Sequence, residues 1–516
     1  MDRFSERTLE VEAGSGPKAG TKAGTKAGIK AGTKATAPAP VSAAVSAAAP
    51  EAPEAPEAPE APEAPEAPEA PEAPEAPEAP APNPRATLAV TSAATALALM
   101  TYIAPMVTLA DTAAALHTAP TAQAWLLNGT PLGLAALLLV SGTLADDYGR
   151  RRIFLLGTLA LGLTTALGAL TTTTWQFTLA RVAQGAASAA LLASALGLIV
   201  HAFPDARGRV RATGVWGAFV SGGIAVGPLL SGALPGWRWV YVLLGAAALV
   251  VTAVGFRTLT ESRSPRGARP DLLGAVTFGL ALVALVAALT LGRDGWLRAP
   301  VGWLLLAAVI LVGLFGGVER RVKAPMIDLS LLRRPSFLAS SAGGLFMGLA
   351  VIGLFSFLPT VLQRSLGLAP LATAWLFLVW SGLSFAVALQ ARRLNGRVPP
   401  RHQLTLGFAL HLVGVLTMLG AIDAGSWPRL LPGLILGGIG SGLLNAALPL
   451  LAVESVPATR AAMGSGAQQT FRYVGSCAGV ALTIALATTP GGGTDLALLV
   501  SAGLAGLGAV GVALAK

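Results

Sequence analysis

The sequence is poor in the side chains on which most soluble enzymes depend. Its 516 residues include one cysteine and four histidines, and only 12% of them are charged. The single cysteine, Cys477, excludes an intrachain disulfide, and no Cys or His spacing is typical of a metal site. No nucleophile and base stand in a catalytic pattern. We therefore expect no metal and no cofactor, and an enzyme is the class that the sequence favours least.

Acidic residues are scarce as well, because 26 Asp and Glu stand against 36 Lys and Arg, for a formal net charge of +10. A basic balance can indicate binding to nucleic acid. Most of the Lys and Arg, however, fall in short loops between apolar runs or near the N-terminus. Basic residues placed in this way orient a protein in a lipid bilayer. We therefore expect the bilayer, and no nucleic acid, as a partner.

The sequence is rich in long apolar runs. Hydrophobic residues make up 53% of the chain, and the mean hydropathy is +0.66. A helix crosses the hydrocarbon core in about 20 residues. Runs of roughly that length occupy 87–110, 124–145, 153–172, 175–200, 211–233, 239–257, 272–292, 301–318, 337–360, 369–391, 402–422, 429–453, 464–487 and 494–514. We predict an all-α polytopic membrane protein with fourteen spanning helices.

The loop charges test this count independently of hydropathy. If alternate loops are cytoplasmic, one side holds Arg150–Arg152, Arg460 and the basic clusters within 207–211, 257–269, 320–334 and 392–401, and the other side holds only Arg238, Arg293, Arg298, Arg364 and Arg429. The positive-inside rule puts the richer side in the cytoplasm. We therefore expect a multi-pass protein of the cytoplasmic membrane, monomeric, with both termini in the cytoplasm.

Residues 1–85 contain no apolar run. Lysines recur every four residues from Lys18 to Lys34, and a Glu-Ala-Pro triplet repeats from Glu51 to Pro80. Neither block can bury a core, so we predict a disordered cytoplasmic tail. Its lysines would either touch anionic lipid headgroups or stay solvated without a partner.

An ordered motif lies between the second and third apolar runs. It reads Gly142-Thr-Leu-Ala-Asp146-Asp-Tyr-Gly149-Arg150-Arg-Arg152. A short cytoplasmic loop explains the arginines but not the spacing of the glycines and the acid. The spacing resembles the loop signature of the major facilitator superfamily. The resemblance implies that Gly142, Asp146, Gly149, Arg150 and Arg152 form a cytoplasmic gate.

The same resemblance implies a domain organisation. Residues 86–257 would form a first bundle of six helices, and 336–516 a second. Between them, 258–335 would hold an inserted helix pair and its linkers. The run from Glu319 to Phe337 is similar to the linker after the extra pair in the fourteen-helix drug:proton antiporter branch. Two packed bundles around a central cavity are a common route to alternating access.

One arginine is expected inside the fourth apolar run. Arg181 and Gln184 stand in the order Arg-x-x-Gln-Gly, one helical turn apart on the same face. An ionisable group within the membrane is costly, and it is a functional candidate by default. The sequence is similar to a superfamily motif whose arginine is linked to proton coupling. A structural arginine that reaches the outer headgroups is the alternative.

The fifth apolar run carries ordered glycines. Gly214, Gly223, Gly227, Pro228 and Gly232 are spaced as in the exporter-specific motif of the superfamily. Gly223 and Gly227 would let a neighbouring backbone approach closely, and Pro228 would bend the helix. The resemblance implies a hinge or seal and favours export. Ordinary small-residue packing is the alternative.

A second cation is expected in the run 464–487. Gln468 and Arg472 share one helix face there. With Asn128 and Asn445, Arg472 would line the central cavity, although each asparagine fits an interhelical hydrogen bond equally well. The aromatics Phe355, Phe357, Trp375 and Trp380 would either meet an apolar substrate or, as the sequence favours for each, pack between helices or contact lipid.

One departure from the family bears on the coupling ion. Relatives with fourteen helices carry an aspartate in the first helix, but here the nearest acid is Asp111 at its outer end. Either Asp111 or Asp146 titrates, or coupling differs, or the charge of the substrate supplies the drive. The absence of a buried acid also argues against permanent cations as substrates.

The leading hypothesis from sequence is therefore an exporter. It would move amphipathic small molecules, such as drugs, antibiotics or secondary metabolites, outward by alternating access in antiport with protons. An uptake permease on the same fold is the first alternative. A transporter-like sensor or assembly protein that acts through residues 1–85 is the second.

Overall fold

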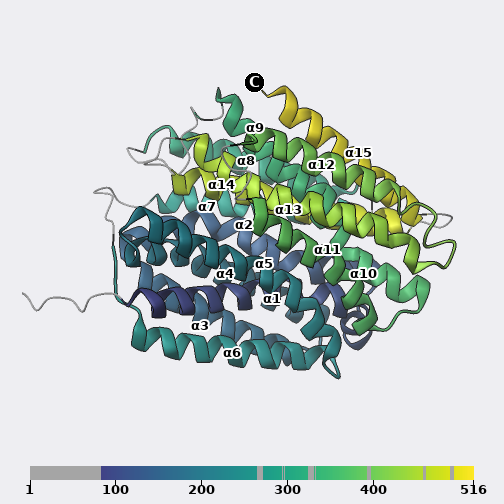
Figure 1. The fold of residues 1–516 in the computed structure, drawn as a ribbon, viewed down its shortest axis with the longest axis horizontal. Coiled ribbons are helices and arrows are strands. Elements are labelled where there is room, and N and C mark those ends of the chain that lie inside the picture. Colours follow the sequence, from purple (N-terminus) through teal and green to yellow (C-terminus); the bar gives the residue numbers. More distant parts are fainter. Residues whose placement is uncertain are drawn as a thin grey trace, which may run out of the picture. The chain divides into compact units, whose positions relative to one another are not determined.

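The chain adopts an all-helical fold in its described part. The computed structural model describes residues 83–515 except 264–270, 293–294, 296, 323–330, 332, 392–396, 457–460 and 489–492, and within them no strand is formed (Figure 1). The predicted tail, apart from its last residues, and parts of the predicted linkers lie outside the described residues. The boundary expected at residue 85 falls just inside the first helix, because Asn83 caps that helix and Pro84 begins it.

The first half of this unit and the inserted pair contain eight long helices. Their bounds are α1 (Pro84–Ala115), α2 (Gln123–Tyr148), α3 (Arg150–Ala169), α4 (Thr174–Ala202), α5 (Ala206–Ala233), α6 (Trp237–Thr258), α7 (Leu272–Gly292) and α8 (Ala299–Glu319). A 3₁₀ turn, η1 (Pro120–Ala122), precedes α2.

The second half continues with α9 (Pro335–Phe346), η3 (Met347–Ile352), α10 (Gly353–Leu366), α11 (Pro370–Ala391), α12 (Pro400–Leu416), η4 (Trp427–Leu430), α13 (Leu431–Glu454), α14 (Ala461–Ala487) and α15 (Gly493–Leu514). The elements α9, η3 and α10 form one continuous span, and the middle element η3 is a π-helix. Each of the fourteen predicted apolar runs thus corresponds to a helical segment of the described residues.

Thirteen of these segments, within the described residues, are long and apolar enough to cross a membrane. The fourteenth is α12, which has 17 residues and is the shortest of the set. The run 402–422 predicted a longer helix, and that prediction is wrong at its end. The chain leaves the helix after Leu416, and Gly420 takes a left-handed φ of +68° while its N–H donates to Asp495.

Helix packing repeats between the two halves. In the first half, α4 packs against α2 and α3, α1 against α5, and α3 against α6. The second half repeats this pattern, because α13 packs against α11 and α12, the span α9–α10 against α14, and α12 against α15. The fold is therefore two matched six-helix bundles, as the sequence predicts. They meet where α2 packs against α14 and α5 against α11.

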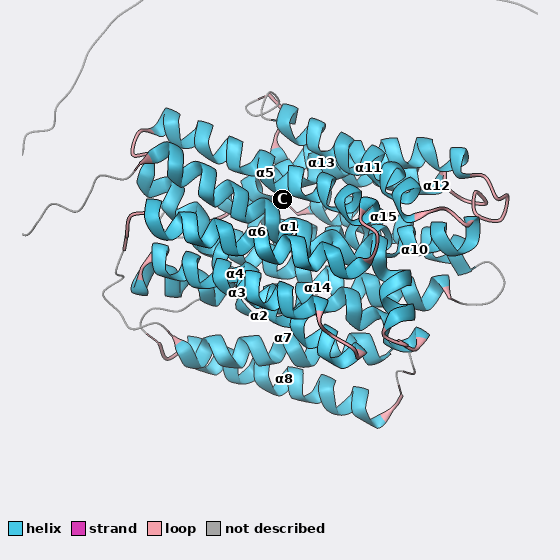
Figure 2. Cartoon of the chain, turned by 90° about the horizontal axis from the view of Figure 1, so that it is seen from below, coloured by secondary structure: helices cyan, strands magenta, loops and turns pink. Residues whose placement is uncertain are grey.

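The inserted pair lies at one edge of this unit. Figure 2 shows α7 and α8 side by side below the bundles, and α7 also packs against α2 and α14. The pair therefore covers one of the two seams between the halves. Its outer helix is strongly exposed and apolar, with Trp303, Val309 and Val312 among its uncovered side chains. Apolar side chains facing outward are what a lipid environment requires.

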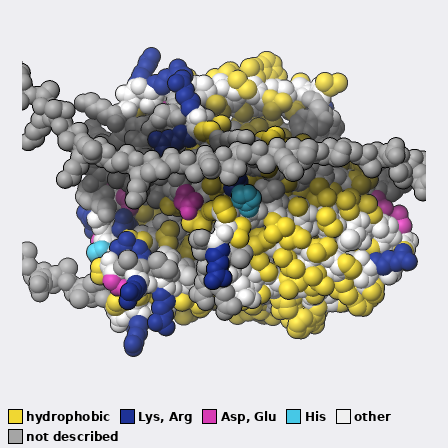
Figure 3. Space-filling model, turned by 45° about the horizontal axis from the view of Figure 1, so that its top comes forward, with side chains coloured by type: hydrophobic (Ala, Val, Ile, Leu, Met, Phe, Trp, Pro, Cys, Tyr) yellow, Lys and Arg dark blue, Asp and Glu magenta, His cyan; other side chains and the backbone are white. Residues whose placement is uncertain are grey.

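Charged residues gather at one end of the helices. In Figure 3 most of the dark-blue Lys and Arg of the visible face lie toward the left, and a wide apolar area occupies the right. We call the end that carries Arg150–Arg152 the arginine end, and the opposite one the far end.

The hydrogen bonds between the halves cluster away from the arginine end. Among the described residues, Gln363 of α10 donates to the Val107 carbonyl of α1 at 2.8 Å, and Arg364 donates to Gln123 of α2 at 3.2 Å. All four residues lie near the far end. These bonds join the two halves near the far end.

Candidate functional site

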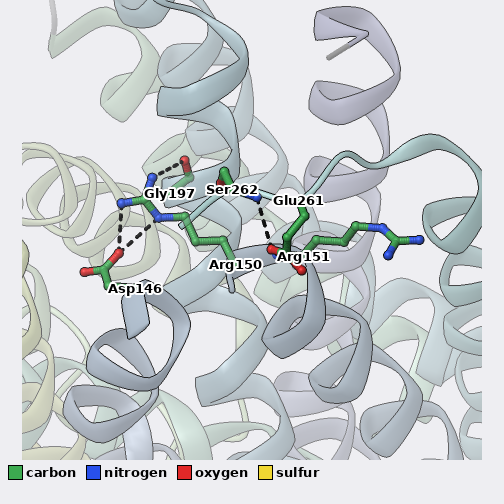
Figure 4. A network of polar contacts seen from close by, with 6 residues as sticks. All are labelled: Asp146, Arg150, Arg151, Gly197, Glu261 and Ser262. Atoms are coloured by element: carbon green, nitrogen blue, oxygen red, sulfur yellow. Dashed lines mark hydrogen bonds and ion pairs between the residues drawn. The ribbon is translucent and has the colours of Figure 1, made fainter. Parts of the chain in front are cut away.

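The turn between α2 and α3 is held by an ion pair across it. Arg150 donates to Asp146 Oδ1 from Nε at 3.0 Å and from Nη2 at 2.8 Å (Figure 4). Its Nη1 reaches the Gly197 carbonyl of α4 at 3.3 Å. Because the pair is only 16% and 21% exposed, it is better shielded than a surface pair. The predicted gate residues Asp146 and Arg150 therefore lock α2, α3 and α4 together at the arginine end.

A carboxylate that the sequence reasoning missed completes this turn. Glu261, which follows α6, accepts hydrogen bonds from the backbone N–H of Arg151 at 3.0 Å and of Ser262 at 3.1 Å (Figure 4). Its other oxygen lies 3.6 Å from Nε of Arg152. The signal available in the sequence was an acid placed directly after the sixth apolar run. Glu261 ties the chain after α6 to the start of α3.

Gly149 is the residue that makes room for this carboxylate. Its φ is +115°, and a Cβ there would lie 2.7 Å from the Glu261 carboxyl carbon. A residue with a side chain would therefore be strained in the backbone and would displace Glu261. Gly142 differs, because a Cβ there would meet nothing within 4 Å. The geometry gives Gly142 no packing role.

Arg181 lies fully buried between α4 and α1. Its Nη1 donates to the Thr101 carbonyl at 2.6 Å and to Gln184 Oε1 at 2.9 Å, and its Nη2 donates to the Tyr102 carbonyl at 3.0 Å. Pro105 explains why the first carbonyl is available, because it has no N–H to donate to Thr101 four residues earlier. Arg181 thus fills a gap in the hydrogen bonding of α1. It does not reach the outer headgroups.

The glycines of α5 face two different neighbours. A Cβ on Gly223 would lie 2.6 Å from the Ala96 carbonyl oxygen, and one on Gly227 would lie 3.1 Å from Met100 Cα, so both meet the backbone of α1. Gly232 instead meets Leu371 of α11 in the other half, at 3.0 Å. A Cβ on Gly214 would meet nothing within 4 Å. Pro228 lies within α5, between Gly227 and Gly232.

A cavity lies between the two bundles. Among the described residues it is lined by Tyr102, Ile103, Met106, Ser221, Ile224, Met347, Ile352, Phe355, Ser356, Phe377, Trp380, Ser381, Ser384, Phe385, Ser441, Asn445 and Arg472. These residues come from α1 and α5 of one half and from η3, α10, α11, α13 and α14 of the other. Both halves therefore build the same site.

Aromatic rings form one wall of the cavity. Phe355 stacks on Trp380 with ring centroids 4.4 Å apart, and Phe377 lies 4.9 Å from Trp380. The cavity holds about 40 Å³ for the centres of water molecules, which is room for a few waters. A drug-sized ligand needs several hundred Å³. The halves must therefore move apart before such a molecule can enter.

Arg472 is the charged residue among the described lining. Its Nη1 donates to Gln469 at the long distance of 3.4 Å, and its buried Nε has no partner. Asn445 lies on the α13 wall, with Nδ2 3.4 Å from both Ser384 Oγ and Ser441 Oγ. The cavity thus combines apolar walls with a few polar groups, as small-molecule sites do.

Known proteins share this arrangement. The profile of the Major Facilitator Superfamily matches residues 89–480. The chain belongs to the major facilitator superfamily. It is 35% identical over 373 residues to "Multidrug resistance protein Stp" of Mycobacterium tuberculosis, which covers 69% of this chain and 67% of that protein. It is 33% identical over 383 residues to "Puromycin resistance protein pur8" of Streptomyces alboniger, which covers 71% and 75%.

A third superfamily relative and two solved structures agree. "Multidrug efflux pump LfrA" of Mycolicibacterium smegmatis is 28% identical over 365 residues, or 70% of this chain and 72% of that protein. A bacterial homologue of the human lysosomal transporter Spinster, inward-facing and occupied, has a TM-score of 0.60 at 16% identity over 83% of this chain and 96% of that one. The peptide transporter POT has a TM-score of 0.61 at 15% identity over 83% and 93%. These structures share the superfamily fold.

The residues predicted for coupling and for the cavity lie in different places in the structure. Arg472 and Asn445 line the cavity, whereas Arg181 and Gln184 lie behind it, where Gln184 reaches the Thr164 carbonyl of α3 at 3.3 Å. Gln468 is buried against Gly344 of α9.

Asn128 makes interhelical hydrogen bonds and does not line the cavity. Its Nδ2 donates to the Cys477 carbonyl of α14 at 3.0 Å and to Thr290 of α7 at 3.3 Å. It therefore joins both halves and the inserted pair at one point. Sequence alone left this choice open, because the neighbours of α2 are distant in the chain.

Proposed function

We propose that this chain exports an amphipathic small molecule across the cytoplasmic membrane by alternating access, in antiport with protons. The observation that carries the proposal is the cavity, because it lies at the seam of two matched halves and is too small for a drug-sized ligand in this structure. A site of this kind binds substrate only when the halves part. The relatives named as resistance proteins and as an efflux pump favour outward transport.

The proposal assigns roles to the predicted residues. The arginine end faces the cytoplasm, as the positive-inside rule requires, and both termini lie there. Asp146, Arg150 and Glu261 form the cytoplasmic gate, since they hold the ends of α2, α3, α4 and α6 together. Gly223 and Gly227 keep α5 closed against α1. The protein acts as a monomer, because one chain builds the whole cavity.

Proton coupling needs a group that changes charge during the cycle. Among the described residues no carboxylate lines the cavity, and Asp111 is exposed at the far end of α1. Asp146 is the acid best placed to respond, because it lies on α2 and is bound to Arg150 across the gate. A proton on Asp146 would weaken this pair and loosen the arginine end.

Everted membrane vesicles test the proposal. Respiration makes their interior acidic and positive, so an exporter should accumulate dye inside them, and rhodamine 123 and fluorescein serve as probes. With the potential collapsed by valinomycin and potassium, the pH gradient alone should still drive accumulation, and further addition of nigericin should stop it; vesicles without the protein give the baseline. Accumulation that disappears when the potential is collapsed, although the pH gradient remains, would refute proton coupling while leaving export intact. A protein that moves neither dye would refute export.

Two further experiments address the alternatives. Whole cells that express the protein should retain less dye than control cells, whereas an uptake permease would make them retain more. Deletion of residues 1–82, which spares the Asn83 cap of α1, should leave transport unchanged. If the deletion abolished a resistance phenotype and spared dye transport, the tail would be the functional part.

A further inference from the structure

The cavity is asymmetric in charge. Arg472 brings a cation to it, and among the described lining residues no Asp or Glu balances that charge. We infer that the cavity is selective for aromatic anions, and that Arg472 binds the anionic group of the substrate. This inference rests on the proposed function and names the substrate class of the same site.

Arg181, which is fully buried, and Arg472, which is half-buried, differ in what they bind. Arg181 uses both terminal nitrogens on short hydrogen bonds to Thr101, Tyr102 and Gln184, of 2.6 to 3.0 Å. Arg472 makes one long bond, from Nη1 to Gln469 at 3.4 Å, and none from Nη2 among the described residues, while Nε is unpartnered in both arginines. The terminal nitrogens of Arg181 are therefore committed to the fold, while Nη2 of Arg472 remains available to a ligand.

The chemistry of the guanidinium group selects the ligand. It presents its N–H donors in a planar fork that matches a carboxylate or a sulfonate through two parallel hydrogen bonds. A cation within the membrane is costly without an anionic partner. An anion bound at Arg472 would satisfy its unpaired donors and neutralise its charge. A cationic ligand in the same place would add to the repulsion.

The remaining walls select an aromatic body. The stacked pair Phe355 and Trp380, with Phe377 beside it, offers ring faces and edges to a flat apolar molecule. Across from α14, the cluster Ser384, Ser441 and Asn445 is held only by contacts of 3.4 Å, which leaves its hydroxyl and amide groups able to bind substrate oxygens. An aromatic acid with further hydroxyl or carbonyl groups fits this set.

An anionic substrate also fits the direction of transport. The cell interior is negative, so the membrane potential drives an anion outward, and no acid of the protein is required for that part of the drive. This agrees with the sequence, which lacks the usual aspartate in the first helix.

A charge-matched pair of dyes tests the inference. Fluorescein and rhodamine 123 share a xanthene core and differ in the sign of their charge, and the methyl ester of fluorescein removes the carboxylate. Fluorescence polarisation with the purified full chain should give tight binding of fluorescein, and binding of the ester and of rhodamine 123 weaker by about tenfold or more. This comparison uses the wild-type protein and does not depend on any variant folding.

Two substitutions assign the effect to the residue. Arg472→Gln should weaken fluorescein binding by about 10- to 100-fold and bring it close to that of the ester, while Arg472→Lys should keep part of the preference. Arg429→Gln removes an exposed cation of η4, outside the cavity, and should change the binding of neither dye. Thermal unfolding shows whether each variant is folded.

The outcomes separate the inference from the proposed function. If rhodamine 123 binds as tightly as fluorescein, if Arg472→Gln leaves fluorescein binding unchanged, or if the wild type binds neither dye, the inference is wrong. Should everted vesicles accumulate rhodamine 123 but not fluorescein, export stands and the anion selectivity fails. Should they accumulate neither dye, the proposed function itself fails.

Discussion

Pro105 and Arg181 are linked through a single carbonyl oxygen. Pro105 cannot donate a hydrogen bond to Thr101, and Nη1 of Arg181 donates to that carbonyl at 2.6 Å instead. A helix defect in α1 and a buried cation in α4 therefore satisfy one another. This relationship explains how an arginine that is fully buried is tolerated in the first bundle.

We expect the two residues to be coupled in stability. Arg181→Met should lower the melting temperature, because it leaves the Thr101 carbonyl without a donor. Adding Pro105→Ala should recover part of the loss, since an alanine at this position supplies the missing helical N–H, with a coupling of about 1 kcal/mol. Thermal unfolding of the wild type, the two single variants and the double variant in detergent measures this coupling. Pro131→Ala in α2 is the control, and equal rescue by it would contradict the account.

At the arginine end, a substitution of Gly149 should lower stability, whereas a substitution of Gly142 should be tolerated. Gly149→Ala places a Cβ against Glu261 and strains the backbone, at a cost of about 1–3 kcal/mol. Gly142→Ala meets nothing within 4 Å and should be neutral in stability. Melting temperature and dye accumulation in everted vesicles compare the two variants. Similar losses from both would show that the motif works by something other than this contact.

Adjacent glycines of α5 offer the same kind of comparison. Gly223→Ala would bring a Cβ within 2.6 Å of the Ala96 carbonyl, a backbone atom that cannot yield without moving α1. Gly222→Ala meets nothing within 4 Å. We expect the first variant to lose transport and to leak protons, measured as faster decay of the pH gradient in vesicles, and the second to match the wild type. If the pH gradient decays no faster in vesicles with Gly223→Ala than in vesicles with the wild type, a sealing role for Gly223 is contradicted.

Much of the fold could be predicted because hydropathy and loop charge are local signals. The fourteen runs follow from the order of apolar segments and arginines, whereas the two halves and the inserted pair were implied by the resemblance of the motifs to the superfamily. The early end of α12 could not be predicted, because the left-handed turn at Gly420 depends on Asp495, which is distant in sequence. The run up to Ile422 remains apolar although it is no longer helical.

The site was predictable in part, for the same reason. Asp146 and Arg150 are four residues apart on either side of Gly149, so their proximity follows from the local sequence. Glu261 and the cavity wall of Phe355 and Trp380 reach their partners only through tertiary packing. The role of Asn128 was decided in the same way, by neighbours on α7 and α14 that no spacing reveals.

Movement of the two halves is the central claim, and Cys477 reports on it directly. This sole cysteine of the chain is buried at the seam where Asn128 joins α14, on the side of the far-end hydrogen bonds. An impermeant maleimide added from outside should label it slowly in the resting protein. Labelling should become faster during transport or in Gln363→Ala, which lacks the bond to Val107. Leu297→Cys in a Cys477→Ser background, fully exposed between α7 and α8, gives the accessible reference.

The measurement is therefore the rate of Cys477 labelling with and without transported dye. The account predicts a rate that rises severalfold with dye and rises further in Gln363→Ala, while the reference cysteine stays constant. A rate that is the same in all three conditions, in intact cells shown to export dye, would contradict the claim that the halves part at this seam.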